Sequence, residues 1–261
     1  MPPAIKNKLS DFKSNFRFGK LFFEDAPPCP KSFRGKTYEK DRIYACYFLF
    51  SAVSASSQIN EILKRIDAHR NALKSLQADI TISKFSVQSG ETSKKEGVIN
   101  FLPLKANFAL RVDSAKPVPE SFIISQNQYL LYLPNFDLFY LPVRQIAYTG
   151  TPTDQHKNMF IIFSNLSKEQ IKTNYSVRYT GEEKVNGSTP TWHLELIPKT
   201  AKSDKKIEFW IDGNGMPIQS KVAETGGDSS STLLTNLKKN LTLKSADFKI
   251  DLPKDTQIIK N

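Results

Sequence analysis

Short segments with a two-residue period dominate the chain from Leu76 to Pro253 and limit the folds available to it. Apolar and polar residues alternate over roughly six to ten positions, and turn residues such as Asp212-Gly213-Asn214-Gly215 separate the segments. Because successive side chains of a strand point to opposite faces of a sheet, this pattern predicts an antiparallel meander of roughly eleven or twelve strands. The expected strands cover residues 79–87, 97–102, 107–113, 121–125, 128–134, 138–142, 175–182, 191–198, 206–212, 218–224, 231–239 and 246–253.

Two segments have helical rather than strand periodicity. The first begins at Ser57, a plausible N-cap, and predicts an amphipathic helix of about five turns. The second covers residues 154–166 and is followed by Ser167-Lys168-Glu169-Gln170, which has the form of a capping box. Its apolar centre, Met159 to Phe163, offers apolar side chains on more than one side, so we expect it to lie against the sheet. The apolar face of the first helix comprises Ile59, Ile62, Leu63, Ile66, Leu73 and Leu76.

A sheet of this size cannot stay flat, because strand twist accumulates and the sheet curls toward a barrel. The fold class is therefore mainly β, with an α+β character from the two helices. Apolar residues make up 39% of the chain and aromatic residues 11%, more than two short helices would cover. On residue types alone, a filled core and a ligand cavity explain this excess of apolar residues equally well.

The segment 43–55, IYACYFLFSAVSA, resembles a secretory signal peptide. It has a charged flank, an apolar run too short to span a bilayer, and small residues before a cleavage point after Ala55. We expect the mature domain to cover 56–261. We expect residues 1–42 to be an extension that either precedes the true start of translation or is disordered. The alternative is that they form a cytoplasmic tail on a signal anchor. Both cysteines, Cys29 and Cys46, precede the mature domain, which excludes a disulfide there.

The sequence gives little support to catalysis or nucleic-acid binding. The net charge of +11 comes from scattered lysines rather than arginine runs with interleaved aromatics, so no nucleic-acid partner is expected. His69, His156 and His193 lie far apart without ligand spacing, and no metal is expected. There is no G-x-S-x-G elbow and no glycine loop that would hold a phosphate. We therefore expect no enzyme activity and no cofactor.

The order of elements resembles the LolA-type family of periplasmic outer-membrane lipoprotein carriers. The segments that carry the resemblance are collinear: Leu76-Gln77-Ala78-Asp79-Ile80, Asn107 to Val112, Leu130 to Phe139, the helix at 154–166, Leu194 to Lys199, Ile211 to Pro217, and Phe248 to Pro253 followed by Ile258-Ile259. The resemblance covers essentially all of 57–261. It implies a single unclosed antiparallel β-barrel of about eleven strands, with helices as a lid on its concave face.

The resemblance also implies a function. Carriers of this type shelter the acyl chains of lipoproteins in the periplasm, between an inner-membrane releasing transporter and an outer-membrane acceptor. The protein is expected to be a monomer. The alternative on the same scaffold is a periplasmic lipid-sensing or binding module that signals through protein contacts.

One position departs from the family pattern. Proteobacterial carriers have an arginine four residues before the phenylalanine aligned with Phe108, and that arginine bonds to carbonyls of the lid. Here the position is Leu104, which cannot make that bond, so Lys105 substitutes, the alignment slips, or the opening mechanism differs.

The expected acyl site combines apolar positions of many strands with the apolar centre of the second helix. The lipid-binding positions are Phe85, Phe101, Phe108, Leu110, Phe122, Ile124, Leu131, Leu194, Leu196, Phe209 and Ile211. The lid positions are Met159, Phe160, Ile162 and Phe163.

Overall fold

The computed structural model describes residues 39–104, 107–136, 144–163, 167–200, 206–224 and 226–261, with side chains described from Ser56 onward. Residues 46–261 form one compact unit that contains the whole sheet. The helices are α1 (Glu39–Ala72), α2 (Asp154–Met159), the 3-10 helix η1 (Ile161–Phe163), α3 (Lys168–Asn174) and the 3-10 helix η2 (Ser245–Phe248). The strands are β1 (Leu76–Phe85), β2 (Thr92–Pro103), β3 (Phe108–Lys116), β4 (Glu120–Ser125), β5 (Gln128–Phe136), β6 (Arg144–Gly150), β7 (Tyr175–Val185), β8 (Thr189–Pro198), β9 (Lys206–Asp212), β10 (Pro217–Ala223), β11 (Ser229–Lys239) and β12 (Gln257–Lys260).

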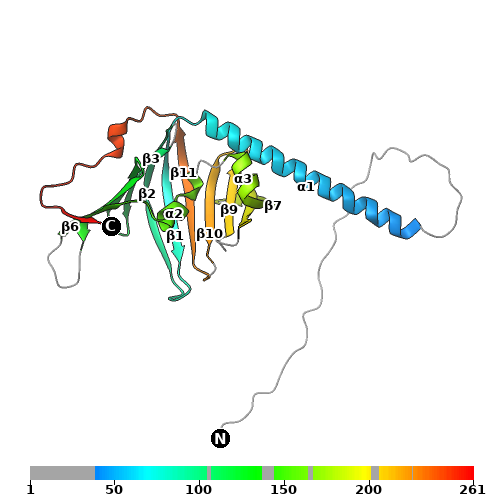
Figure 1. Cartoon of the computed structure of the whole chain (residues 1–261), viewed down its shortest axis with the longest axis horizontal. Coiled ribbons are helices and arrows are strands. Elements are labelled where there is room, and N and C mark those ends of the chain that lie inside the picture. The colour runs from blue at the N-terminus through cyan, green and yellow to red at the C-terminus, as the bar shows by residue number, and fades with distance from the viewer. Residues whose placement is uncertain (1–38, 105–106, 137–143, 164–166, 201–205, 225) are drawn as a thin grey trace, which may run out of the picture. The chain divides into compact units, whose positions relative to one another are not determined.

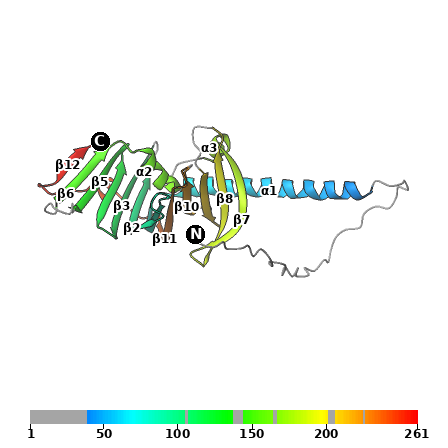
Figure 2. The ribbon, with the colours of Figure 1, turned by 90° about the horizontal axis from the view of Figure 1, so that it is seen from below.

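The twelve strands of the described residues belong to one sheet, in the order β12-β6-β5-β4-β3-β2-β1-β11-β10-β9-β8-β7. Neighbours are antiparallel except β12 and β6, which are parallel. The terminal strands of this order, β12 and β7, do not pair with each other, so the sheet is not closed. Figures 1 and 2 show the curved sheet with α2 on one of its sides. The predicted fold class, an unclosed antiparallel barrel with an N-terminal helix and short helices, is confirmed.

Strand register gathers the apolar residues on one face of the sheet, here called the inner face. In β1 the buried Leu76, Ala78, Ile80 and Ile82 alternate with more exposed polar residues. The register continues this face across the neighbouring strands, because Leu76 lies opposite Phe101, Phe101 opposite Leu110, and Leu110 opposite Ile124. On the other side of β1, Phe209 lies opposite Leu194 in the same way. Side chains of this face therefore form one continuous core.

The C-terminal part of α1 covers the inner face near the hairpin between β9 and β10. Ile62 and Leu63 of the helix are fully buried in the core. Arg65 donates through Nη1 to the backbone oxygen of Gly213 at 3.0 Å, and its guanidinium lies 5.1 Å from the ring centroid of Trp192. The predicted N-cap at Ser57 is wrong, since Ser57 lies inside α1, which begins at Glu39. Leu73 and Leu76 follow the helix, and Leu76 begins β1.

The C-terminal segment differs from the prediction of a strand at 246–253. Residues 245–248 form η2, in which the carboxylate of Asp247 accepts a hydrogen bond from the backbone N–H of Lys244 at 2.7 Å. This local bond competes with strand pairing, as aspartate side chains commonly do. The strand that joins the sheet is β12, further along the chain. The strand expected at 138–142 lies outside the described residues, and β6 was not predicted.

The opposite, outer face carries a polar network on β7, β8 and β9. Glu195 is buried there and forms ion pairs with Arg178 and Lys206. Next to it, His193 lies between two carboxylates, with Nδ1 2.8 Å from Glu183 and Nε2 2.9 Å from Glu208. The hydrogen bond from Lys206, supported by Arg178, holds the pKa of Glu195 below its ordinary value.

Replacement of Lys206 by methionine is expected to destabilise the protein by about 1–3 kcal/mol at neutral pH, because it removes the main partner of a buried carboxylate. A carboxyl group whose pKa is lowered on folding stabilises the fold above its ordinary pKa of 4.5, and this contribution is lost as the pH falls. The difference between Lys206→Met and the parent should therefore shrink below that pH. Urea unfolding at pH 7 and at acidic pH measures it. Lys221→Met, at an exposed position of β10, is the control, and an equal loss in both variants would contradict the prediction.

Candidate functional site

A short helical segment, α2 followed by η1, lies over the inner face of the sheet and is called the lid (residues 154–163). The backbone N–H of Thr153 donates to Nδ1 of His156 at 3.2 Å, and this bond fixes the start of α2. The α-helix ends at Met159, and η1 follows after Phe160, so the predicted single helix over 154–166 is broken here. Residues 164–166 lie outside the described part of the chain. The break turns consecutive apolar residues toward the sheet.

Aromatic rings hold the lid against the sheet. The ring of Phe160 stacks on that of Phe122 with centroids 5.3 Å apart, and the ring of Phe163 lies 4.8 Å from that of Phe101. His156 lies 5.1 Å from Phe122 and 4.6 Å from Tyr129. Aromatic pairs at such distances contribute about 0.5–1.5 kcal/mol each beyond the area that they bury. Ring packing therefore holds the lid against the sheet at both α2 and η1.

Two hydrogen bonds join the lid to the side of the sheet where β10 and β11 meet. Thr232 of β11 donates through Oγ1 to the backbone oxygen of Met159 at 2.8 Å. Asn158 donates through Nδ2 to Oε1 of Glu224 at 3.3 Å. A side chain of the sheet therefore bonds to a backbone carbonyl of the lid, and this side chain is Thr232. Leu104, at the family position, follows β2 and is 40% exposed.

The structure brings together all but one of the expected lipid-binding positions. Phe85 lies apart from this cluster, 38% exposed at the end of β1, because the register gives the inward position to Lys84. The lid positions pack against the same cluster. The expected positions inside the cluster or packed on it are Phe101, Phe108, Leu110, Phe122, Ile124, Leu131, Leu194, Leu196, Phe209, Ile211, Met159, Phe160, Ile162 and Phe163.

Cavities flank the lid on both sides. One of about 240 Å³ lies between the lid and strands β1 to β5, and its lining includes Val112, Phe122 and Leu131. Another of about 340 Å³ lies on the opposite side of the lid, beside Phe108 and Ile124. Phe160 and His156 line both cavities. The lid thus borders both cavities, and the first also has Lys84, Lys95 and Glu120 in its lining.

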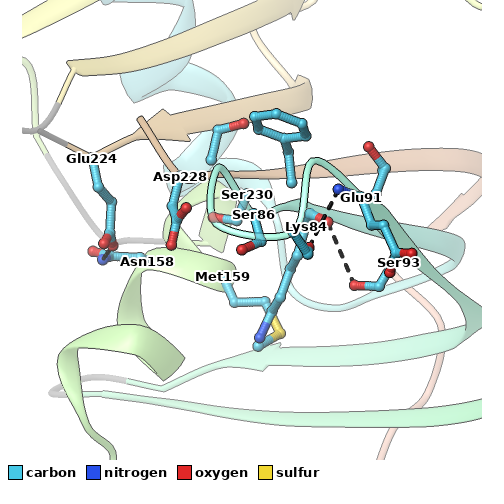
Figure 3. Close-up of a pocket in the computed structure, with 13 residues that line it drawn as sticks. Lys84, Ser86, Glu91, Ser93, Asn158, Met159, Glu224, Asp228 and Ser230 are labelled. Atoms are coloured by element: carbon cyan, nitrogen blue, oxygen red, sulfur yellow. Dashed lines mark hydrogen bonds between the residues drawn. The ribbon is translucent and has the colours of Figure 1, made fainter. Parts of the chain in front are cut away.

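A third cavity, of about 390 Å³, is polar and lies where β1, β2, β11 and α2 meet (Figure 3). It is called the polar cavity below. Lys84, Ser93 and Met159 line both this cavity and the 240 Å³ apolar cavity, so the two adjoin. The lining consists of Lys84, Phe85, Ser86, Ser89, Glu91, Thr92, Ser93, Asn158, Met159, Glu224, Asp228, Ser229 and Ser230.

Two groups at this junction have shifted pKa values. Burial lowers the pKa of the Lys84 ammonium, and the positive charge of Lys95 adds to the effect. Burial also lowers the pKa of His156, with a smaller contribution from Lys84. Both shifts reflect poor solvation of positive charge beside the apolar cavity. An anionic group placed there would be attracted to Lys84.

Sequence reasoning missed the polar cavity and the network around His193. The cavity lining comes from three stretches far apart in the chain, 84–93, 158–159 and 224–230, and no local pattern joins them. In the described part of the chain, no group of three or more His, Cys, Asp or Glu side chains has an arrangement that could hold a metal ion. No helix among the described residues is both long and apolar enough to cross a membrane.

Comparison with known proteins gives similar folds only among solved structures. Neither a family model nor a curated protein matches the sequence. A domain described as an outer membrane lipoprotein-sorting protein from Vibrio parahaemolyticus is 17% identical, covering 72% of this chain and 94% of its own, with a TM-score of 0.37. A LolA superfamily protein from Nitrosomonas europaea is 11% identical, covering 73% and 97%, with a TM-score of 0.36.

The lipoprotein LppX from Mycobacterium tuberculosis is also similar. It is 11% identical, with coverage of 71% of this chain and 99% of its own, and has a TM-score of 0.42. Proteins of the type that the sequence resembles are thus among the similar structures. The low identities and TM-scores do not assign this chain to a family.

Proposed function

We propose that the protein is a carrier that shelters acyl chains on the inner face of its sheet, beneath the lid. One observation carries the proposal: the lid residues His156 and Phe160 line both the cavity of about 240 Å³ and the cavity of about 340 Å³. Displacement of the lid would join the two cavities into one apolar trough. Each acyl methylene buried there would contribute about 0.8 kcal/mol, offset by the cost of moving the lid.

The sequence resemblance supports a more specific version of this proposal. In that version, residues 43–55 direct export, and the protein carries lipoproteins or lipids through the periplasm toward the outer membrane. An inner-membrane transporter would release the cargo and an outer-membrane protein would accept it. The protein would carry out no catalysis.

Phe108→Glu in the full chain tests the acyl site. Phe108 is half-buried, lines the 340 Å³ cavity and lies 5.7 Å from the ring of Phe101, so a carboxylate there would meet the ligand chain. We expect at least a roughly ten-fold weaker affinity for a fluorescent fatty acid, because burying an unpaired charge is costly. Ile211 is a poorer choice because it is fully buried, and a charge there would unfold the core.

The matched control is Val98→Glu, which adds the same charge to β2 at a position that is 39% exposed and opposite Asp79 on the outer face. It should bind the fatty acid like the parent. Far-UV circular dichroism shows whether each variant is folded. Unchanged binding by a folded Phe108→Glu variant would rule out the inner face as the acyl site.

A further inference from the structure

Lys84 occupies an unusual place for a lysine. It lies at an inward position of β1 and is only partly exposed, at the boundary between the polar cavity and the 240 Å³ apolar cavity. Within the described part of the chain, its ammonium has no hydrogen bond or ion pair, whereas the nearby Lys95 pairs with Glu120 at 2.6 Å. A partly buried, unpaired ammonium is costly, and an anionic ligand group would relieve that cost.

The polar cavity also contains negative charge, at Glu91 between β1 and β2 and, on the side away from Lys84, at two further carboxylates. Glu224 and Asp228 come from the segment that joins β10 to β11, and Figure 3 shows them across the cavity from Lys84. Asp228 is held in place by the backbone N–H of Val87, which donates to Oδ1 at 2.8 Å. These carboxylates would repel a purely anionic group that filled the cavity, but they would attract an ammonium. The cavity lining therefore has one positive and three negative groups, and two of the negative groups lie away from Lys84.

We propose that the polar cavity binds a zwitterionic phospholipid head group, with the phosphate on Lys84 and the ammonium near Asp228 and Glu224. The acyl chains of the same molecule would pass Lys84 into the adjoining apolar cavity. This inference rests on the proposed carrier function and specifies its cargo class. A volume of about 390 Å³ suits a head group rather than a folded polypeptide.

Head-group binding would also weaken a hydrogen bond that holds the lid. The Glu224 carboxylate that would meet the ammonium accepts a hydrogen bond from Asn158 of the lid. A ligand ammonium carries a full positive charge, so the Glu224 carboxylate would attract it more strongly than it attracts the neutral amide of Asn158. Recognition of the head group would thereby loosen the lid.

The test compares three ligands that carry the same acyl-linked fluorophore on the full chain: phosphatidylethanolamine, phosphatidylglycerol and diacylglycerol. We expect the zwitterionic lipid to bind about ten-fold more tightly than the other two, as one or two charge-assisted hydrogen bonds would give. Lys84→Met should weaken both phospholipids relative to diacylglycerol, because both carry the phosphate that Lys84 would bind. Asp228→Asn keeps the acceptor for Val87 and should weaken only phosphatidylethanolamine.

The control is Lys94→Met, which removes an exposed lysine on the neighbouring strand, outside the cavity lining. It should bind all three lipids like the parent. Equal affinity for the three lipids in parent and Lys84→Met would overturn the head-group site while leaving the acyl carrier intact. Tighter binding of phosphatidylglycerol than of phosphatidylethanolamine, with no effect of Asp228→Asn, would overturn the zwitterionic assignment. Failure of diacylglycerol to bind at all would instead contradict the carrier function.

Discussion

Replacement of Phe160 by alanine is expected to lower the free energy of unfolding by about 3–5 kcal/mol and, at the same time, to tighten binding of acyl ligands. The loss of stability follows from burial, since Phe160 is 3% exposed and stacks on Phe122. The gain in binding follows from position, because Phe160 lines both apolar cavities and its removal would join them. A ligand that fills the new space should restore part of the lost stability, as any ligand of the native state does.

Thermal unfolding with and without a fatty acid measures both effects. Phe248→Ala is a matched control, because Phe248 is also 3% exposed but belongs to η2, which packs on β3 and β4 and is not part of the inner-face core. It should cost similar stability without any gain in ligand binding. If Phe160→Ala bound acyl ligands no better than the parent, the lid would be part of the permanent core and the proposed route of entry would be wrong.

Substitution of Gly215 by alanine is expected to be the most damaging small change near α1. Gly215 has a φ of +86°, which L-residues rarely adopt, and a Cβ there would lie 2.2 Å from the backbone oxygen of Arg65. The backbone conformation alone costs about 1–2 kcal/mol, and the contact with α1 adds to it. Because the atom that the Cβ would clash with belongs to the backbone of α1, the helix itself must shift away from the hairpin between β9 and β10.

Gly213→Ala provides the comparison within the same turn. A Cβ at Gly213 meets nothing within 4 Å, and its φ lies outside the left-handed region. We expect Gly213→Ala to change the melting temperature little, and Gly215→Ala to lower it clearly and to increase proteolysis near Ile62 and Leu63. Equal melting temperatures for the two variants would show that α1 does not depend on this close approach.

Local patterns were sufficient to predict most strands and one helix start. The two-residue period gave β9 with its observed ends, Lys206 and Asp212, because the glycine-rich turn that follows marks the boundary. The capping box at Ser167 is present, with Ser167 Oγ accepting from the N–H of Gln170 at 3.1 Å and Gln170 accepting from the N–H of Ser167 at 2.8 Å. Such features depend on residues a few positions apart, so a sequence reveals them.

Features that depend on register could not be predicted in the same way. His193 was interpreted as isolated because its carboxylate partners lie far from it in the sequence. Glu183 reaches it only after a register shift between Tyr179 and Gly181, where Gly181 has a φ of +138°. Lys84 was likewise overlooked beside Phe85, since one residue of register decides which of the two faces the cavities. Long-range pairing therefore limits what the sequence alone can say about the site.

The central place of β1 in the strand order also affects how the chain acquires its fold. β1 pairs on one edge with β2, which follows directly, and on the other with β11, Ser229–Lys239. During synthesis from the N-terminus, that second edge has no partner until almost the entire chain has emerged. Until then a ten-residue strand presents unpaired N–H and C=O groups, which can recruit other extended chains. Non-local pairing of this kind slows folding and lengthens exposure to aggregation.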